Sequence, residues 1–158
     1  MPGHPPAHRC GAATNGVMGM LVRECLRSAP VTVPPECTLE EAAQLMGRHG
    51  VGSLLVMTGG RLSGIVTDRD VAVRGIGTGK AAGAHVSTVM TADPVTIQGS
   101  EDVFGALKAF QAQGVRRLPV LEDEELAGII SVDDLLVTLV LELGAVVSPV
   151  ARELLDPS

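Results

Sequence analysis

The sequence has 158 residues, a formal net charge of −6 and 46% apolar residues, with no Trp, no Tyr and two Phe. This length suits one compact domain or two very small ones, and the composition predicts an aliphatic core. The acidic balance argues against nonspecific binding to nucleic acid or anionic membranes, and the chain lacks the aromatic platforms that stack single-stranded bases.

Cysteine usage and the N-terminal composition indicate a cytoplasmic protein. Cys10, Cys25 and Cys37 form no CxxC pair, and an odd number of cysteines without a secretory segment is typical of reduced thiols. The most apolar run, Leu135–Leu143, includes Glu142 and is half the ~20 residues that a membrane span needs. We expect a soluble protein without a metal site, because Cys25 and Cys37 lack partners at zinc-site spacing. His4, His8 and Cys10 could in principle meet a metal, but a flexible tail is the simpler interpretation.

The chain divides into a tail, two repeats and an extension. Residues 1–19 are rich in Gly, Pro, Ala and His without apolar periodicity, which predicts a disordered tail. A shift of 64 residues then aligns Val22–Ile76 with Val86–Val140 without a gap and with fourteen identical positions. Repeat one is therefore assigned to residues 20–79 and repeat two to residues 80–143, and residues 144–158 remain as a C-terminal extension.

Each repeat starts with a short helical turn, Val22–Arg27 or Val86–Thr91, and a strand after a proline, Val31–Val33 or Val95–Ile97. A helix follows. In repeat one Thr38 and Glu41 have the spacing of a capping box. Gly50 and its equivalent Gly114 stand where a glycine ends a helix.

Two short apolar runs with a turn between them come next, which predicts a hairpin in each repeat. The runs are Ser53–Met57 with Leu62–Val66, and Leu118–Leu121 with Leu126–Ile130. A second helix is predicted to start near Thr67 and Ser131. The order is β-α-β-β-α, twice, which predicts an α+β (mixed α/β) domain with pseudo-two-fold symmetry and a cleft between the halves, because one such unit buries too little surface alone.

The second helix of repeat two carries a wide apolar face, formed by Leu135, Leu136, Leu139, Val140 and Leu143. Part of this face must cover the sheet, and the remainder is expected to pack against a second chain. Pro149 is predicted to break the helix, with one more turn over Ala151–Leu155.

The residues with the most specific chemistry end the last strand of each repeat. Gly64-Ile65-Val66-Thr67-Asp68-Arg69-Asp70 and Gly128-Ile129-Ile130-Ser131-Val132-Asp133-Asp134 share a glycine, two aliphatic residues, a hydroxyl residue and an Asp. The hydroxyl lies at a helix N-terminus, where phosphate is favoured, and the Asp lies one turn deeper on the same face. There it can accept hydrogen bonds from both hydroxyls of a ribose. The same spacing also fits an ordinary capping box.

These motifs resemble the cystathionine β-synthase (CBS) domain pair, or Bateman module. The resemblance includes Ala29-Pro30-Val31-Thr32-Val33, Asp93-Pro94-Val95-Thr96-Ile97 and Val115-Arg116-Arg117-Leu118-Pro119-Val120, and it covers roughly residues 20–143. It implies a stand-alone pair of tandem CBS repeats. Such pairs commonly form disc-like homodimers.

The resemblance also implies which residues bind a ligand. Asp70 and Asp134 would hold the ribose of AMP, ADP or ATP, and Thr67 and Ser131 would contact phosphate or ribose. The two adenine pockets would be formed by Ala29, Pro30 and Val31, and by Asp93, Pro94 and Val95. Arg69, Arg116 and Arg117 are candidates for the phosphate, although Arg116 and Arg117 also fit solvated surface positions. Because these arginines are distributed unevenly, the two sites need not be equivalent.

The sequence thus predicts a regulatory module that binds an adenine nucleotide as its ligand, has no cofactor and acts through its dimer or an unknown effector protein. We expect no enzyme, because the chain has no P-loop, no dinucleotide Gly-rich loop and no His beside a nucleophile. The alternative is a protein-interaction or scaffold module whose cleft is filled by its own side chains.

Overall fold

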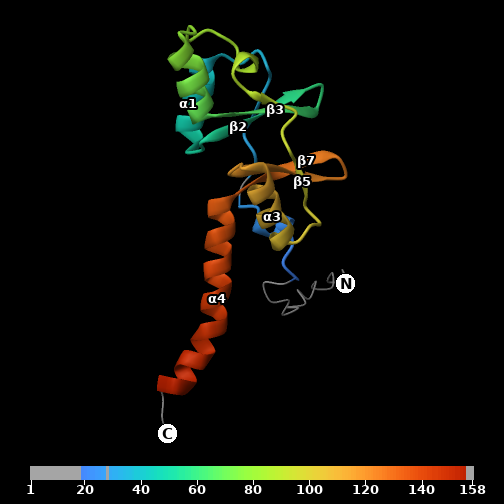
Figure 1. The fold of residues 1–158 in the computed structure, drawn as a ribbon, viewed down its shortest axis with the longest axis vertical. Coiled ribbons are helices and arrows are strands. Elements are labelled where there is room, and N and C mark those ends of the chain that lie inside the picture. The colour runs from blue at the N-terminus through green and yellow to red at the C-terminus, as the bar shows by residue number, and fades with distance from the viewer. Residues whose placement is uncertain (1–18, 28, 156–158) are drawn as a thin grey trace, which may run out of the picture.

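The computed structural model describes residues 19–27 and 29–155, with side chains to residue 144, so the predicted tail lies outside it except for Gly19. Two units with the same element order follow one another (Figure 1). The first comprises β1 (Thr32–Val33), α1 (Leu39–His49), β2 (Ser53–Thr58), β3 (Arg61–Thr67) and α2 (Asp68–Asp70). The second comprises β5 (Ile97–Gln98), α3 (Val103–Gln113), β6 (Arg117–Glu122), β7 (Glu125–Ser131) and α4 (Val132–Leu155). The predicted mixed α/β fold is confirmed.

Each unit has its own sheet. The strand orders are β1-β2-β3-β4 and β5-β6-β7, and only the first strand of each sheet runs parallel to its neighbour. The extra strand β4 (Thr91–Ala92) comes from the start of the second repeat and pairs with β3. The two sheets lie face to face and are in contact through β3 and β7, with α1 and α3 on their outer sides (Figure 1).

The helix ends follow from the local sequence. The Thr38 hydroxyl accepts a hydrogen bond from the Glu41 backbone N–H at 3.2 Å, and the Glu41 carboxylate accepts one from the Thr38 N–H at 2.9 Å. This capping box starts α1. Both α1 and α3 end at a glycine in the left-handed region, Gly50 with φ +64° and Gly114 with φ +62°. A side chain is strained in this region, which explains the glycines.

The lead segments η2 (Val22–Cys25) and η5 (Val86–Thr88) are exchanged between the repeats. The Val22 N–H donates to the Glu101 carbonyl, and the equivalent Val86 N–H donates to the Cys37 carbonyl, each at 2.8 Å. Val22 and Cys25 accordingly belong to the core of the second unit, whereas Val86 belongs to that of the first. The chain between η2 and β1 must therefore cross from one unit to the other.

The second helices of the two units differ. After α2 the chain continues as a π segment, η3 (Val71–Gly75), and a 3₁₀ turn, η4 (Ile76–Thr78). By contrast, α4 is a helix of 24 residues that extends away from the body (Figure 1). The predicted break at Pro149 is wrong, because α4 continues to Leu155. A proline removes one backbone hydrogen bond from a helix, and α4 continues past Pro149 despite this loss. It also crosses residue 144, where the extension was predicted to begin.

Most of the predicted apolar face of α4 is divided between core and solvent. Leu135 is fully buried, whereas Leu136, Val140 and Leu143 are more than half exposed. No helix within the described residues is both long and apolar enough to cross a bilayer.

Candidate functional site

The two predicted ribose-binding aspartates both take part in capping boxes. One carboxylate oxygen of Asp70, Oδ2, accepts hydrogen bonds from the Thr67 N–H at 2.9 Å and the Thr67 hydroxyl at 2.7 Å. Oδ2 of Asp134 accepts equivalent bonds from the N–H of Ser131, at 3.0 Å, and its hydroxyl. Capping therefore uses Oδ2 in each repeat and leaves Oδ1 available for another partner, so both interpretations of the motif can hold together.

Asp134 lines a cleft of about 240 Å³ between the repeats. The cleft also contains the predicted residues Ser131 and Arg117 from the second repeat and Ala29, Pro30 and Val31 from the first. Residues that the sequence analysis did not nominate complete it, namely Arg27, Ile129 and the stretch Gly50, Val51, Gly52 and Ser53. In the structure, Asp134 therefore lies in the same cleft as the start of the proline-led strand of the first repeat.

Arg27 lies beside Asp134, with its Nε 4.0 Å from Oδ1. Both side chains are partly open to solvent, at 48% for Arg27 and 35% for Asp134. Sequence reasoning assigned Arg27 only to the end of a helical turn. Because η2 packs on the second unit, the chain after it enters the cleft, and this exchange of the lead segments gives no local signal in the sequence.

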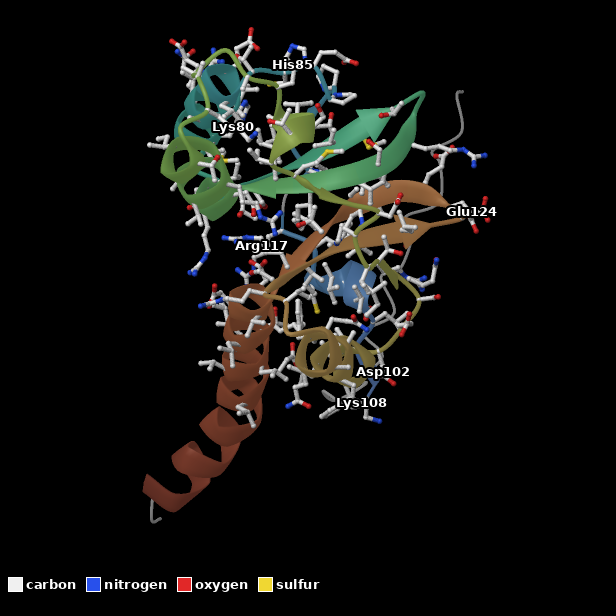
Figure 2. All side chains as sticks on the ribbon, turned by 45° about the horizontal axis from the view of Figure 1, so that its top comes forward. Lys80, His85, Asp102, Lys108, Arg117 and Glu124 are labelled. Carbon is white, nitrogen blue, oxygen red and sulfur yellow. The ribbon has the colours of Figure 1, made fainter. Side chains whose placement is uncertain are left out.

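Arg117 reaches across the cleft toward the first repeat. A Cβ on Gly52 would lie 2.8 Å from Nη2 of Arg117, so the guanidinium lies over the Gly52 backbone and would have to shift to admit a side chain there. Figure 2 shows Arg117 between the two sheets, close to the start of α4. Among the residues that line the cleft, Arg117 and Arg27 are positively charged and Asp134 is negatively charged. The Asp68 carboxylate also lies near the Arg117 guanidinium, with its Oδ2 3.3 Å from a Cβ on Gly52.

The other two candidate arginines lie outside this cleft. Arg116 forms an ion pair with Asp133 at 3.4 Å, and both side chains are at least 70% exposed. The backbone N–H of Arg69 donates to the Asp68 carboxylate at 2.8 Å, and its side chain is exposed. Arg116 thus occupies the solvated position that the sequence also allowed.

Asp70 is not among the residues that line the cleft at Asp134. Its Oδ1 is 3.5 Å from Nε of Arg74, and its side chain is 15% exposed. Asp93 and Pro94 line a different, wider hollow of about 740 Å³ at the hairpin turns, and Val95 is an exposed residue. The charged residues of that hollow are one arginine, Arg61, and four acidic residues, Asp93, Asp123, Glu124 and Glu125. It is poorly suited to an anion, and Asp70 is not among its residues.

The remaining titratable clusters do not suggest a metal centre. Across the described part of the chain, no group of three or more His, Cys, Asp or Glu side chains is arranged to hold a metal ion. Cys25 and Cys37 are buried, and this burial raises the pKa of each thiol. Every buried side-chain N or O atom of the described residues has a hydrogen-bond partner.

Comparisons with known proteins identify the family to which this fold belongs. The family model described as "CBS domain" matches residues 22–75 and 86–141. The chain is similar to the CBS domain-containing protein YhcV of Bacillus subtilis, with 34% identity over 73% of this chain and 83% of the relative. A solved CBS-domain containing protein from Agrobacterium tumefaciens has 30% identity and a TM-score of 0.68 over 75% of this chain and 98% of that one.

A third similar protein was solved with a ligand. It is the CBS domain protein PAE2072 from Pyrobaculum aerophilum, complexed with AMP, with 21% identity and a TM-score of 0.69 over 77% of this chain and 99% of that one. At this identity the likeness concerns the fold. Because the family model matches both halves of the pseudosymmetric fold, this chain belongs to the CBS domain family as a pair of CBS repeats.

Proposed function

We propose that this CBS pair is a regulatory module that binds an adenine nucleotide in the cleft at Asp134. The observation that carries the proposal is the position of Asp134 Oδ1. This oxygen is not used in capping and lies in a cleft that also holds two arginines and an apolar wall. That combination suits a ligand with a sugar diol, an anionic group and a flat apolar ring.

Each part of a nucleotide has a candidate partner. Asp134 Oδ1 accepts hydrogen bonds from the ribose hydroxyls, while Ser131 continues to orient the carboxylate. The adenine lies against Pro30, Val31 and Ile129. A cleft of about 240 Å³ is below the usual range for drug-sized ligands, so the phosphate extends toward the mouth.

The two arginines bind the phosphate in this arrangement. Arg27 has one contact with Asp134, at 4.0 Å, and exposed ion pairs of this kind contribute about 0–1 kcal/mol. The ribose can therefore displace the guanidinium at little cost, which frees it for the phosphate. Arg117 approaches the cleft from β6 and supplies the second positive charge. The AMP complex of the Pyrobaculum relative supports a ligand of this class.

A regulatory module needs a surface through which ligand binding affects another protein. We propose that this surface forms a homodimer. Val73 and Ile76 are exposed by 57% and 74%, and their repeat equivalents Val137 and Val140 by 46% and 66%. Exposed apolar residues at matching positions of both repeats form a symmetric face, which suits association with a second copy. The module performs no catalysis of its own, operates in the cytoplasm and acts on an effector protein.

The exposed face also favours a second candidate, a protein-interaction module without a ligand. Leu141 and Leu143, exposed by 63% and 58%, extend the apolar surface along α4 beyond the body of the protein. Under this alternative the protein's own side chains take up the cleft, no ligand enters it and only the partner binds. Sedimentation measurements with and without nucleotide report the oligomeric state, and the titrations below decide between the candidates.

Isothermal titration calorimetry with AMP, ADP, ATP and S-adenosylmethionine tests nucleotide binding. We expect saturable binding by the unmodified chain and at least a tenfold loss in Asp134→Ala. Asp133→Ala is the matched control, since it removes a neighbouring exposed carboxylate that pairs only with Arg116. Asp134→Asn keeps an oxygen for the cap and separates folding from binding. Undiminished binding by a folded Asp134→Ala variant would refute the ribose assignment, and no binding of any nucleotide would favour the interaction module.

A further inference from the structure

The two half-sites of the pair differ most clearly at the residue one turn beyond the aspartate. In the second repeat this residue is Thr138, whose hydroxyl donates to the Asp134 backbone carbonyl at 2.8 Å and not to the carboxylate. In the first repeat the equivalent residue is Arg74, which lies in the π segment η3. The Arg74 guanidinium is positively charged and pairs with the Asp70 carboxylate, whereas the Thr138 hydroxyl is neutral. The two aspartates therefore have different partners one turn further along.

Three contacts hold the Arg74 side chain in the first half-site. Its Nε is 3.5 Å from Oδ1 of Asp70, the oxygen that the cap leaves free. Its Nη1 donates to the Val89 carbonyl at 3.1 Å and to the Thr91 hydroxyl at 3.3 Å. Thr91 is the repeat equivalent of Arg27, so Arg74 contacts both the aspartate and the residue that corresponds to Arg27 of the other half-site.

The contacts of the two arginines differ in number and kind. Arg27 has one contact at 4.0 Å with Asp134, whereas Arg74 joins its own helix to two residues after η5. A ligand that displaced Arg74 would have to replace two hydrogen bonds as well as the ion pair. The two aspartates also differ in burial, since the Asp70 side chain is 15% exposed and the Asp134 side chain 35%, whereas the two arginines are similarly exposed, at 53% for Arg74 and 48% for Arg27.

The isoleucine beside each aspartate is also more accessible in the second half-site than in the first. Ile129 lines the cleft at Asp134, whereas its equivalent Ile65 is buried with 8% exposure. With Arg74 at its aspartate and Ile65 buried, the first half-site is closed by its own side chains.

We propose that Arg74 is a built-in occupant of the Asp70 half-site, so that each chain binds a single nucleotide, at Asp134. This inference rests on the proposed function and adds its stoichiometry and the residue that sets it. Arg74 takes the place of the ribose at the free oxygen of Asp70. Arg74 therefore makes ligand binding asymmetric in a pair of repeats whose fold is pseudosymmetric.

Exchanging the two residues between the repeats tests the proposal. Arg74→Thr gives the first half-site the residue of the second, and Thr138→Arg does the reverse. Titration calorimetry with AMP as the probe is run on both variants, on Asp70→Ala and on Asp134→Ala. Circular dichroism and thermal melting show which variants are folded. Asp70→Ala removes a capping box equivalent to the one lost in Asp134→Ala, so these two variants are matched controls.

We expect one AMP per unmodified chain, the same stoichiometry in Asp70→Ala, and at least a tenfold loss of affinity in Asp134→Ala. Arg74→Thr should gain a second, weaker binding event that persists in Arg74→Thr/Asp134→Ala, and Thr138→Arg should weaken AMP binding at least tenfold. Two AMP molecules per unmodified chain would overturn the inference but not the proposed function, and so would a folded Arg74→Thr variant that binds only one. Absence of binding in every protein would overturn the proposed function and the inference with it.

Discussion

Arg27 and Asp134 belong to different repeats, yet their Nε and Oδ1 atoms are 4.0 Å apart across the cleft. The contact exists because η2 packs on the second unit before the chain returns to β1 in the first. A residue at the end of a lead segment therefore meets an aspartate more than a hundred positions later. This relation places a half-exposed guanidinium at the oxygen that we assign to the ribose.

Arg27→Ala should weaken AMP binding more than adenosine binding. Charge-assisted hydrogen bonds contribute about 1.5–3 kcal/mol, and the partial exposure of Arg27 reduces this to roughly a five- to tenfold loss of AMP affinity. Adenosine has no phosphate, so its affinity should not fall. Calorimetric titration of both ligands measures the difference. Equal losses for the two ligands would show that Arg27 does not bind the phosphate.

The two neighbouring arginines of β6 should differ in their effect. Arg117→Ala is expected to reduce AMP affinity roughly five- to tenfold, because Arg117 lines the cleft. Arg116→Ala is the control with the same charge change, and it should alter affinity less than twofold because its ion pair with Asp133 lies in solvent. Gly52→Ala should resemble Arg117→Ala, since its Cβ would displace the guanidinium. An equal loss in both arginine variants would indicate a general effect of charge.

Two glycines near the end of α1 should respond in opposite directions to alanine. Gly47 lies inside the helix with no atom within 4 Å of an added Cβ, so Gly47→Ala should stabilise the protein by about 0.5–1 kcal/mol. Gly50 has φ +64°, so Gly50→Ala should destabilise it by about 1–2 kcal/mol. Urea unfolding of the two variants measures both changes. Shifts of the same sign would contradict the assignment of Gly50 as the residue that ends α1.

The two core thiols should be unreactive in the folded protein at neutral pH. Burial raises the pKa of Cys25 and of Cys37, and the thiolate is the reactive form, so folding moves their reactivity to higher pH. A Cys10→Ser variant removes the third thiol, and a chromogenic disulfide reagent then measures the other two. We expect slow reaction in buffer and rapid reaction of both thiols in denaturant. Rapid reaction of the folded variant at pH 7 would show that these thiols are accessible.

Local sequence signals predicted most of the elements. The Thr38–Glu41 spacing, Gly50 and Gly114 correctly located helix ends, because capping depends on neighbours a few residues apart. The hairpins followed from apolar runs around short turns. The break at Pro149 was predicted wrongly, since a proline weakens a helix locally without requiring it to end.

The candidate site was only partly visible in the sequence. Asp134 and Ser131 could be nominated because their spacing recurs in both repeats. The pairing of Asp70 with Arg74 was also accessible, because opposite charges four residues apart on a helix are neighbours. Arg27 could not be nominated in this way, since its distance from Asp134 along the chain carries no periodic pattern.

The sequence by itself determined the duplicated unit, its element order and the two capped aspartates, because each depends on contacts within a few residues or on the repeat itself. Only the tertiary structure decided which aspartate opens into a cleft, which arginines accompany it and which half-site is filled. These features depend on the exchange of the lead segments and on side chains from opposite repeats, whose separation in space is fixed by packing and not by their order in the chain.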